Sequence, residues 1–172
     1  MKRTIRNTRA RKNVGQALPN SSLVLDIPLE FTTTNKGDLF LIYDSGPTNA
    51  RILIFVTKKN LDILVQLEHW YADGTFKTVP SIFGQLYTIH GVKSGIIMPL
   101  VYALLPNKTE ETYKKFLVAL KEKIPTFQPL TIMIDFELAM VKAIEQEFPR
   151  SQICGCFFIF VRAFIEKYME VD

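Results

Sequence analysis

The chain has few of the residues that characterise secreted or membrane-spanning proteins. Its 172 residues include only two cysteines, Cys154 and Cys156, and two histidines. One residue separates the cysteines, which disfavours a disulfide between them, so we expect a reduced, intracellular protein. The longest apolar run, GIIMPLVYALL, contains Pro99 and is too short to cross a bilayer. The start is basic, but the apolar segment of a secretory signal does not follow it.

The net positive charge of the chain comes from its first twelve residues. The formal net charge is +4, from 21 basic and 17 acidic residues. Six basic residues lie at the N-terminus with no acid among them: Lys2, Arg3, Arg6, Arg9, Arg11 and Lys12. Without these six, 15 basic residues remain against 17 acids, a net charge of −2. We therefore treat residues 1–20 as a flexible basic arm and a candidate for phosphate contacts with DNA, although the same composition fits an ordinary tail or a transit peptide.

Residues 21–68 are predicted to form strands and a short helix that lead into the core. Two short runs rich in strand-forming residues, 38–43 and 51–57, predict strands separated by the turn sequence Asp-Ser-Gly-Pro. The apolar spacing in LDILVQLEHWY predicts a short helix over 61–71.

Residues 69–172 carry the clearest pattern and are predicted to form the core. Three strand-like runs with short Gly- or Pro-containing links, at 69–78, 84–93 and 94–106, indicate an antiparallel meander. Helices over 107–124, 138–148 and 162–172 then alternate with strands over 130–137 and 151–161. Thr109 is the expected N-cap of the first of these helices. This order predicts an α/β fold in which a mixed sheet is flanked by helices.

Two aspartates stand out by their position on this pattern. Asp73 lies in the first strand of the meander, and Asp135 lies at the end of the strand over 130–137. If these strands are neighbours, the two carboxylates form a site for a hard divalent cation, and Glu137 shares the same face of a continuing strand. However, an Asp before Gly is also common in turns, and an Asp at a strand end is a common helix N-cap. The pattern alone leaves both interpretations open.

Four segments of the chain resemble the transposase domain of Mutator-like elements, the MULE family: ADGTFKTVPSIFGQLYTIHG, PLVYALLPNKTEETYKKFL, IDFELAMVKAIEQEFP and ICGCFFIF. The resemblance implies an RNase H-like fold and a DDE-type site that cuts and joins DNA with Mg²⁺ or Mn²⁺ in the nucleus. The aspartate of DGTF, Asp73, and that of DFE, Asp135, would be catalytic metal ligands. Domains of this family also occur with FLYWCH zinc fingers, whose cysteine and histidine spacing is missing upstream in this chain.

The chain departs from the family pattern at two places. Members commonly carry a histidine in a run like GCxFH, where this chain has Ile159. Cys154 and Cys156 are therefore expected to pack in the core on a buried strand. The third acid of the family lies farther downstream, and the spacing of Glu166 and Glu170 identifies neither as that residue. We expect a truncated, inactive copy that does not cleave DNA with Mg²⁺.

Two other functions remain open. One is a domesticated module that binds DNA or protein without cleaving it. The other is a small metal-dependent nuclease that uses Asp73 and Asp135 with Glu137 or Glu166. The isolated histidines, His69 and His90, are expected to be structural and not metal ligands.

Overall fold

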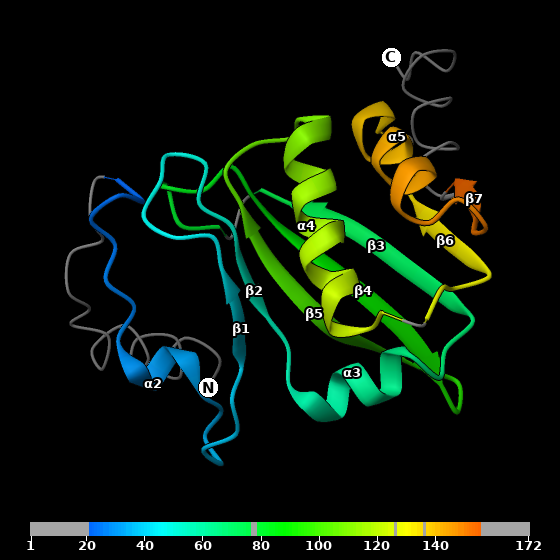
Figure 1. Ribbon diagram of the computed structural model, residues 1–172. Coiled ribbons are helices and arrows are strands. Elements are labelled where there is room, and N and C mark those ends of the chain that lie inside the picture. The colour runs from blue at the N-terminus through cyan, green and yellow to red at the C-terminus, as the bar shows by residue number, and fades with distance from the viewer. Residues whose placement is uncertain (1–20, 77–78, 126, 136, 156–172) are drawn as a thin grey trace, which may run out of the picture.

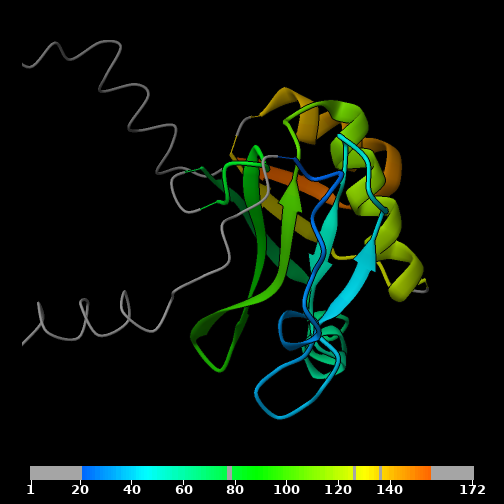
Figure 2. The ribbon, with the colours of Figure 1, turned by 90° about the vertical axis from the view of Figure 1, so that its left-hand side faces the viewer.

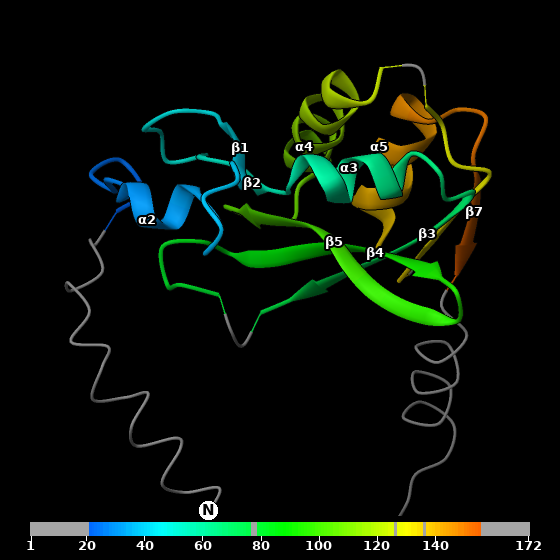
Figure 3. The same cartoon turned by 90° about the horizontal axis from the view of Figure 1, so that it is seen from below.

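The computed structural model describes residues 21–76, 79–125, 127–135 and 137–155. In this part of the chain a seven-stranded sheet carries helices on one face (Figures 1 and 3). The basic arm, Cys156, Ile159 and the helix expected over 162–172 lie outside the described residues. No helix within the described ranges has the length and apolar character needed to cross a membrane.

The sheet combines antiparallel and parallel pairing. Its strands are β1 (Leu41–Asp44), β2 (Leu53–Phe55), β3 (His69–Thr75), β4 (Gln85–Lys93), β5 (Ile96–Leu105), β6 (Thr131–Ile134) and β7 (Gln152–Gly155). The helices are α2 (Leu29–Thr32), α3 (Lys58–Leu64), α4 (Glu110–Lys123) and α5 (Leu138–Glu147). The strand order is β1-β2-β5-β4-β3-β6-β7.

The topology confirms the predicted fold class. Strands β3, β4 and β5 form an antiparallel meander, and β6 returns beside β3 in parallel after α4. Strand β7 then pairs in parallel with β6 after α5. Parallel neighbours need a crossover that passes over one face of the sheet, and the two long helices supply it. The result is the RNase H-like arrangement of a meander followed by helix–strand units.

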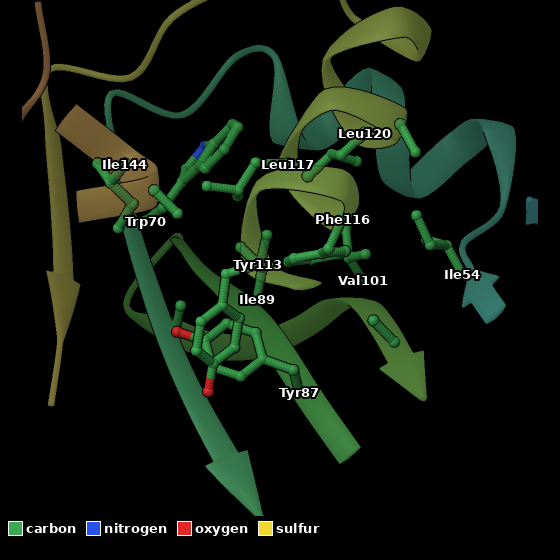
Figure 4. Packing of buried hydrophobic residues seen from close by; sticks show 14 of the residues in the cluster. Ile54, Trp70, Tyr87, Ile89, Val101, Tyr113, Phe116, Leu117, Leu120 and Ile144 are labelled. Atoms are coloured by element: carbon green, nitrogen blue, oxygen red, sulfur yellow. The ribbon is translucent and has the colours of Figure 1, made fainter. Parts of the chain in front are cut away.

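A continuous core lies between the sheet and the helices α3, α4 and α5. On β3, Trp70 and Ala72 are buried while their neighbours are more exposed, as the alternation of a strand requires. Helix α4 covers this face with a buried stripe that includes Phe116 and Leu120 (Figure 4). The predicted cap of α4 is confirmed: Thr109 Oγ1 accepts a hydrogen bond from the backbone N–H of Thr112 at 3.3 Å. Figure 2 shows the helices on one side of the sheet.

The helix predicted over 61–71 is wrong in its bounds. Helix α3 begins at Lys58, because Thr57 accepts a hydrogen bond from the N–H of Asn60, and it ends at Leu64. After a short turn, β3 begins at His69; there Trp70 is 1% exposed and its indole N–H donates to the carbonyl of Leu64. Burial of the tryptophan in the sheet therefore overrides the helical spacing.

Before β2, one buried arginine joins the N-terminal segment to the sheet. Arg51 is 6% exposed and makes two hydrogen bonds to the carboxylate of Asp44, at 2.8 and 2.6 Å. Its guanidinium also donates to the carbonyls of Ser22 and Leu25, at 3.1 and 2.6 Å. The bidentate geometry makes this a strong ion pair. The hydrogen bond from Arg51 lowers the pKa of Asp44, although partial burial opposes the shift.

We predict that Asp44→Asn destabilises the chain at neutral pH by on the order of 1–2 kcal/mol, because Arg51 loses a charged partner. Since the pKa of Asp44 is lower in the folded chain, its stabilising contribution is present above the unfolded value near 4 and is lost as the pH falls through the folded value. Urea unfolding of both proteins at pH 7 and at stepwise lower pH measures the difference, which should shrink towards the acidic end.

Asp62→Asn is the matched control, since Asp62 is 59% exposed and pairs with Lys58 only at 3.7 Å. Its effect should stay within about 0.5 kcal/mol at every pH. Equal effects of the two substitutions would contradict the structural role of Asp44.

Candidate metal centre

Strand β3 holds Asp73 within the sheet and not in a turn. Asp73 pairs with Thr88 of β4, and the ladder continues on both sides of it. Of the two interpretations left open by the sequence, the turn is therefore wrong for Asp73. The next residue, Gly74, faces Gln85: a Cβ at Gly74 would lie 2.7 Å from Gln85 Oε1. The glycine of the DGTF motif thus lets the side chain of Gln85 lie against β3.

Asp135 follows β6 directly, and β6 is the parallel neighbour of β3. The pairing includes Trp70 with Ile132 and Tyr71 with Met133. If this register continues for two more residues beyond Tyr71 and Met133, Asp73 lies beside Asp135. Neighbouring strands lie about 4.8 Å apart, a spacing at which one cation bridges two carboxylates. The predicted side-by-side position of these strands is confirmed.

Asp135 does not serve as the N-cap of α5. The capping position belongs to Glu137, whose side chain makes no capping hydrogen bond. Asp135 Oδ1 is buried and has no hydrogen-bond partner among the described residues. A buried carboxylate oxygen without a donor is costly, so it needs a proton or a cation that the described side chains do not supply.

The charges around Asp135 are unbalanced. Burial raises the pKa of Asp135, and the carboxylates of Glu137 and Asp73 raise it further. The ammonium of Lys108 opposes this shift. Asp73 and Asp135 are thus within electrostatic reach of each other, and a bound divalent cation would relieve their repulsion.

Glu137 lies near Asp135, but at the start of α5 and not on a continuing strand as predicted. The strand does not continue to it, because β6 ends at Ile134 and Glu137 begins α5. Its Oε2 accepts a hydrogen bond from the hydroxyl of Tyr113 at 2.9 Å. The same hydroxyl accepts from Gln85 Nε2 at 2.8 Å, so a chain of hydrogen bonds from β4 through α4 fixes the carboxylate.

Tyr87 is a buried residue of β4 that pairs with Gly74, next to Asp73. Its ring packs against Tyr113, with centroids 5.4 Å apart (Figure 4). Burial raises the pKa of Tyr87 well above its ordinary value, and the charges of Tyr113, Asp135 and Glu137 add to this, so its hydroxyl stays protonated. That hydroxyl and Asp135 Oδ1 are the two buried side-chain polar atoms in the described part that lack a partner.

The donors of this centre fit a hard divalent cation. Asp73 and Asp135 offer only carboxylate oxygens, the ligand type that Mg²⁺ and Mn²⁺ prefer, with water completing the shell. In the described ranges, no three His, Cys, Asp or Glu side chains are grouped closely enough to hold an ion. The site is therefore a pair of carboxylates in this part of the chain, and Glu166 and Glu170 lie outside it.

The remaining candidate ligands lie elsewhere. His69 is exposed, and its Nδ1 is 2.8 Å from Thr131 Oγ1, near the start of β3. His90 is half-buried in β4, the central strand of the order. Cys154 is a free, half-buried cysteine on β7, the last strand in the described sheet, so it does not occupy the buried core position expected for it.

Sequence reasoning missed three residues that shape the centre. Gln85 is a fully buried amide in β4, and a large polar residue among strand-forming residues was the available signal. Tyr113 lies among the buried residues of α4, and the helical spacing of this buried stripe does not reveal the role of its hydroxyl. Lys108 stands directly before the helix cap, but nothing in its spacing marks it.

Matches to this chain were found among family models and among solved structures. The family model described as the MULE transposase domain matches residues 69–163, which include both aspartates. A solved structure of the HTLV-2 integrase catalytic core domain in complex with magnesium aligns with 60% of this chain and 75% of that chain, at 17% identity and a TM-score of 0.36. No curated protein matches the chain.

Two tyrosine substitutions test the hydrogen-bond chain. Tyr113→Phe should lower the free energy of unfolding by about 2 kcal/mol, because Glu137 and Gln85 both lose a buried partner. Tyr87→Phe removes the equivalent hydroxyl from the neighbouring ring, and that hydroxyl has no partner among the described residues. This substitution should therefore change the free energy of unfolding by no more than about 0.5 kcal/mol, or stabilise the chain. Urea unfolding of the metal-free proteins measures both. A larger loss for Tyr87→Phe than for Tyr113→Phe would show that the assigned bonds do not hold the centre.

Proposed function

Because the chain belongs to the MULE transposase domain family, we propose that it acts on DNA through a divalent cation held by Asp73 and Asp135. The observation that carries this proposal is the parallel pairing of β3 with β6. If its register continues beyond Tyr71 and Met133, Asp73 lies beside Asp135. DNA in the nucleus would be the natural substrate of such a domain.

The residues around the pair support this function. When bound, Mg²⁺ or Mn²⁺ would neutralise phosphate charge and activate the attacking oxygen of phosphodiester chemistry. Asp135 would offer its partnerless oxygen to the cation, and Asp73 would offer a second carboxylate from the exposed side of β3. The buried rings of Tyr87 and Tyr113 pack against each other beside Glu137.

A non-catalytic DNA-binding module is the second candidate. In favour of it, the described residues supply two carboxylates for the cation and no grouped third ligand. The nuclease that would use Glu137 as its third acid has less support, because Tyr113 and Lys108 already engage the carboxylate of Glu137. Both candidates share DNA binding, and they differ in whether a phosphodiester is cleaved.

The proposed cation predicts opposite effects of Asp135→Asn with and without metal. Without metal, the substitution removes a repelled, partly buried charge and should stabilise the chain by on the order of 1 kcal/mol, or about 2–4 °C in the melting temperature. With Mn²⁺, wild type should gain stability and Asp135→Asn should not, because only the native pair binds the ion. Thermal unfolding with EDTA and with MnCl₂ measures both effects.

Asp73→Asn should also abolish the Mn²⁺ effect. Glu111→Gln is the control, since Glu111 is an exposed acid of α4 that pairs with Lys115 at 2.7 Å, and it should retain the full effect. Equal stabilisation of all four proteins by Mn²⁺ would place the ion elsewhere and refute the proposed site.

The basic arm predicts a salt-dependent share of DNA affinity. Replacing Lys2, Arg3, Arg6, Arg9, Arg11 and Lys12 by glutamine should weaken binding of a duplex oligonucleotide and flatten the dependence of log K on log salt. If all six contact phosphates, the slope should fall by about 5. Fluorescence anisotropy over a KCl series measures it, and an unchanged slope would show that the arm is only a tail.

A further inference from the structure

The loop between β5 and α4 is fixed firmly beside the metal centre. On one side, the N–H of Gly84 donates to the carbonyl of Leu105 at 2.9 Å, and a Cβ at Gly84 would lie 2.5 Å from the Pro106 carbonyl oxygen. On the other side, Asn107 Oδ1 accepts hydrogen bonds from the hydroxyls of Thr109 and Thr112, at 2.8 and 2.7 Å. The backbone of Lys108, between these anchors, therefore has a defined position.

The side chain of Lys108 extends from this loop towards the acids. Its Nζ lies 3.7 Å from the centroid of the Phe76 ring and 4.0 Å from Glu137 Oε2. Phe76 follows the end of β3, three residues after Asp73. The side chain is 47% exposed, so the ammonium borders both the acidic centre and the solvent.

The contacts of Lys108 within the chain are too weak to account for its place by stability alone. An ion pair at 4.0 Å between partly exposed groups contributes little to stability. A cation–π contact at such an exposed site adds a similarly small contribution. Glu137 already has Tyr113 as a hydrogen-bond donor at 2.9 Å. Lys108 can therefore leave Glu137 at little cost and use its ammonium for another anion.

We propose that Lys108 binds a non-bridging phosphate oxygen of the DNA strand beside Asp73 and Asp135. This inference rests on the proposed function, in which a DNA phosphate meets the aspartate pair. The carboxylates of Asp73, Asp135 and Glu137 repel a phosphate that approaches the aspartate pair. A bound cation would offset only part of this repulsion. The ammonium of Lys108 offsets it on the solvent side, while the Phe76 ring keeps that ammonium within reach.

The test measures DNA affinity without cleavage. Wild type, Lys108→Gln and Lys108→Arg bind a fluorescein-labelled duplex oligonucleotide in CaCl₂ over a KCl series, followed by anisotropy. Lys108→Gln should weaken binding about fivefold and lower the salt slope by about 1, the signature of one lost phosphate contact. Lys108→Arg keeps the charge and should retain most of the affinity and the full slope. Thermal unfolding in EDTA should show little change for either variant.

Lys114→Gln is the matched control, because Lys114 is an exposed lysine on α4. It should leave affinity and slope unchanged. If wild type binds DNA but Lys108→Gln binds equally well with the same slope, the role of Lys108 is refuted while the proposed function stands. If Lys114→Gln has the same effect as Lys108→Gln, the loss of affinity is a general effect of removing an exposed lysine and the inference fails. If wild type does not bind DNA, both proposals fail.

Discussion

The parallel pairing of β3 with β6 is the constraint on which the rest of the centre depends. The two strands are 62 residues apart in register, His69 with Thr131, and the chain between them contains β4, β5 and α4. The meander places β4 and β5 on one side of β3, and α4 returns the chain across the buried face of the sheet so that β6 arrives on the other side, in the same direction as β3. Asp73 and Asp135 are far apart in the sequence, and this crossover brings the strands that lead to them side by side.

Hydrogen bonding around the pair is uneven in the described part of the chain. The chain from Gln85 through Tyr113 to Glu137 satisfies one carboxylate, while Asp135 Oδ1 is buried without a partner. Burial and two neighbouring carboxylates raise the pKa of Asp135. Carboxylates with raised pKa values of this kind are common at functional sites. The ammonium of Lys108, on a fixed loop, opposes this shift and lowers the pKa of Asp135.

Much of this was accessible from sequence, and the failures have physical causes. Local periodicity predicts the meander, and capping chemistry predicts the Thr109 cap. The position of Asp135 at the end of an apolar strand suggested that this strand lies beside that of Asp73. The bounds of α3 did not follow, because the burial of Trp70 in β3 decides them. Glu137 was assigned to a continuing strand, but the chain turns into α5 after β6. The roles of Gln85 and Tyr113 arise from a contact across 28 residues, which no local pattern contains.

The most direct measurement of the central claim is a crystal structure of the protein grown with MnCl₂, with anomalous diffraction used to locate manganese. The account predicts one anomalous peak between β3 and the end of β6, within about 2.2 Å of a carboxylate oxygen of Asp73 and of Asp135 Oδ1, the range of hard-ion coordination. Manganese bound only at other acids, or an Asp135 that acquires a protein hydrogen-bond donor and leaves the site empty at saturating MnCl₂, would contradict it.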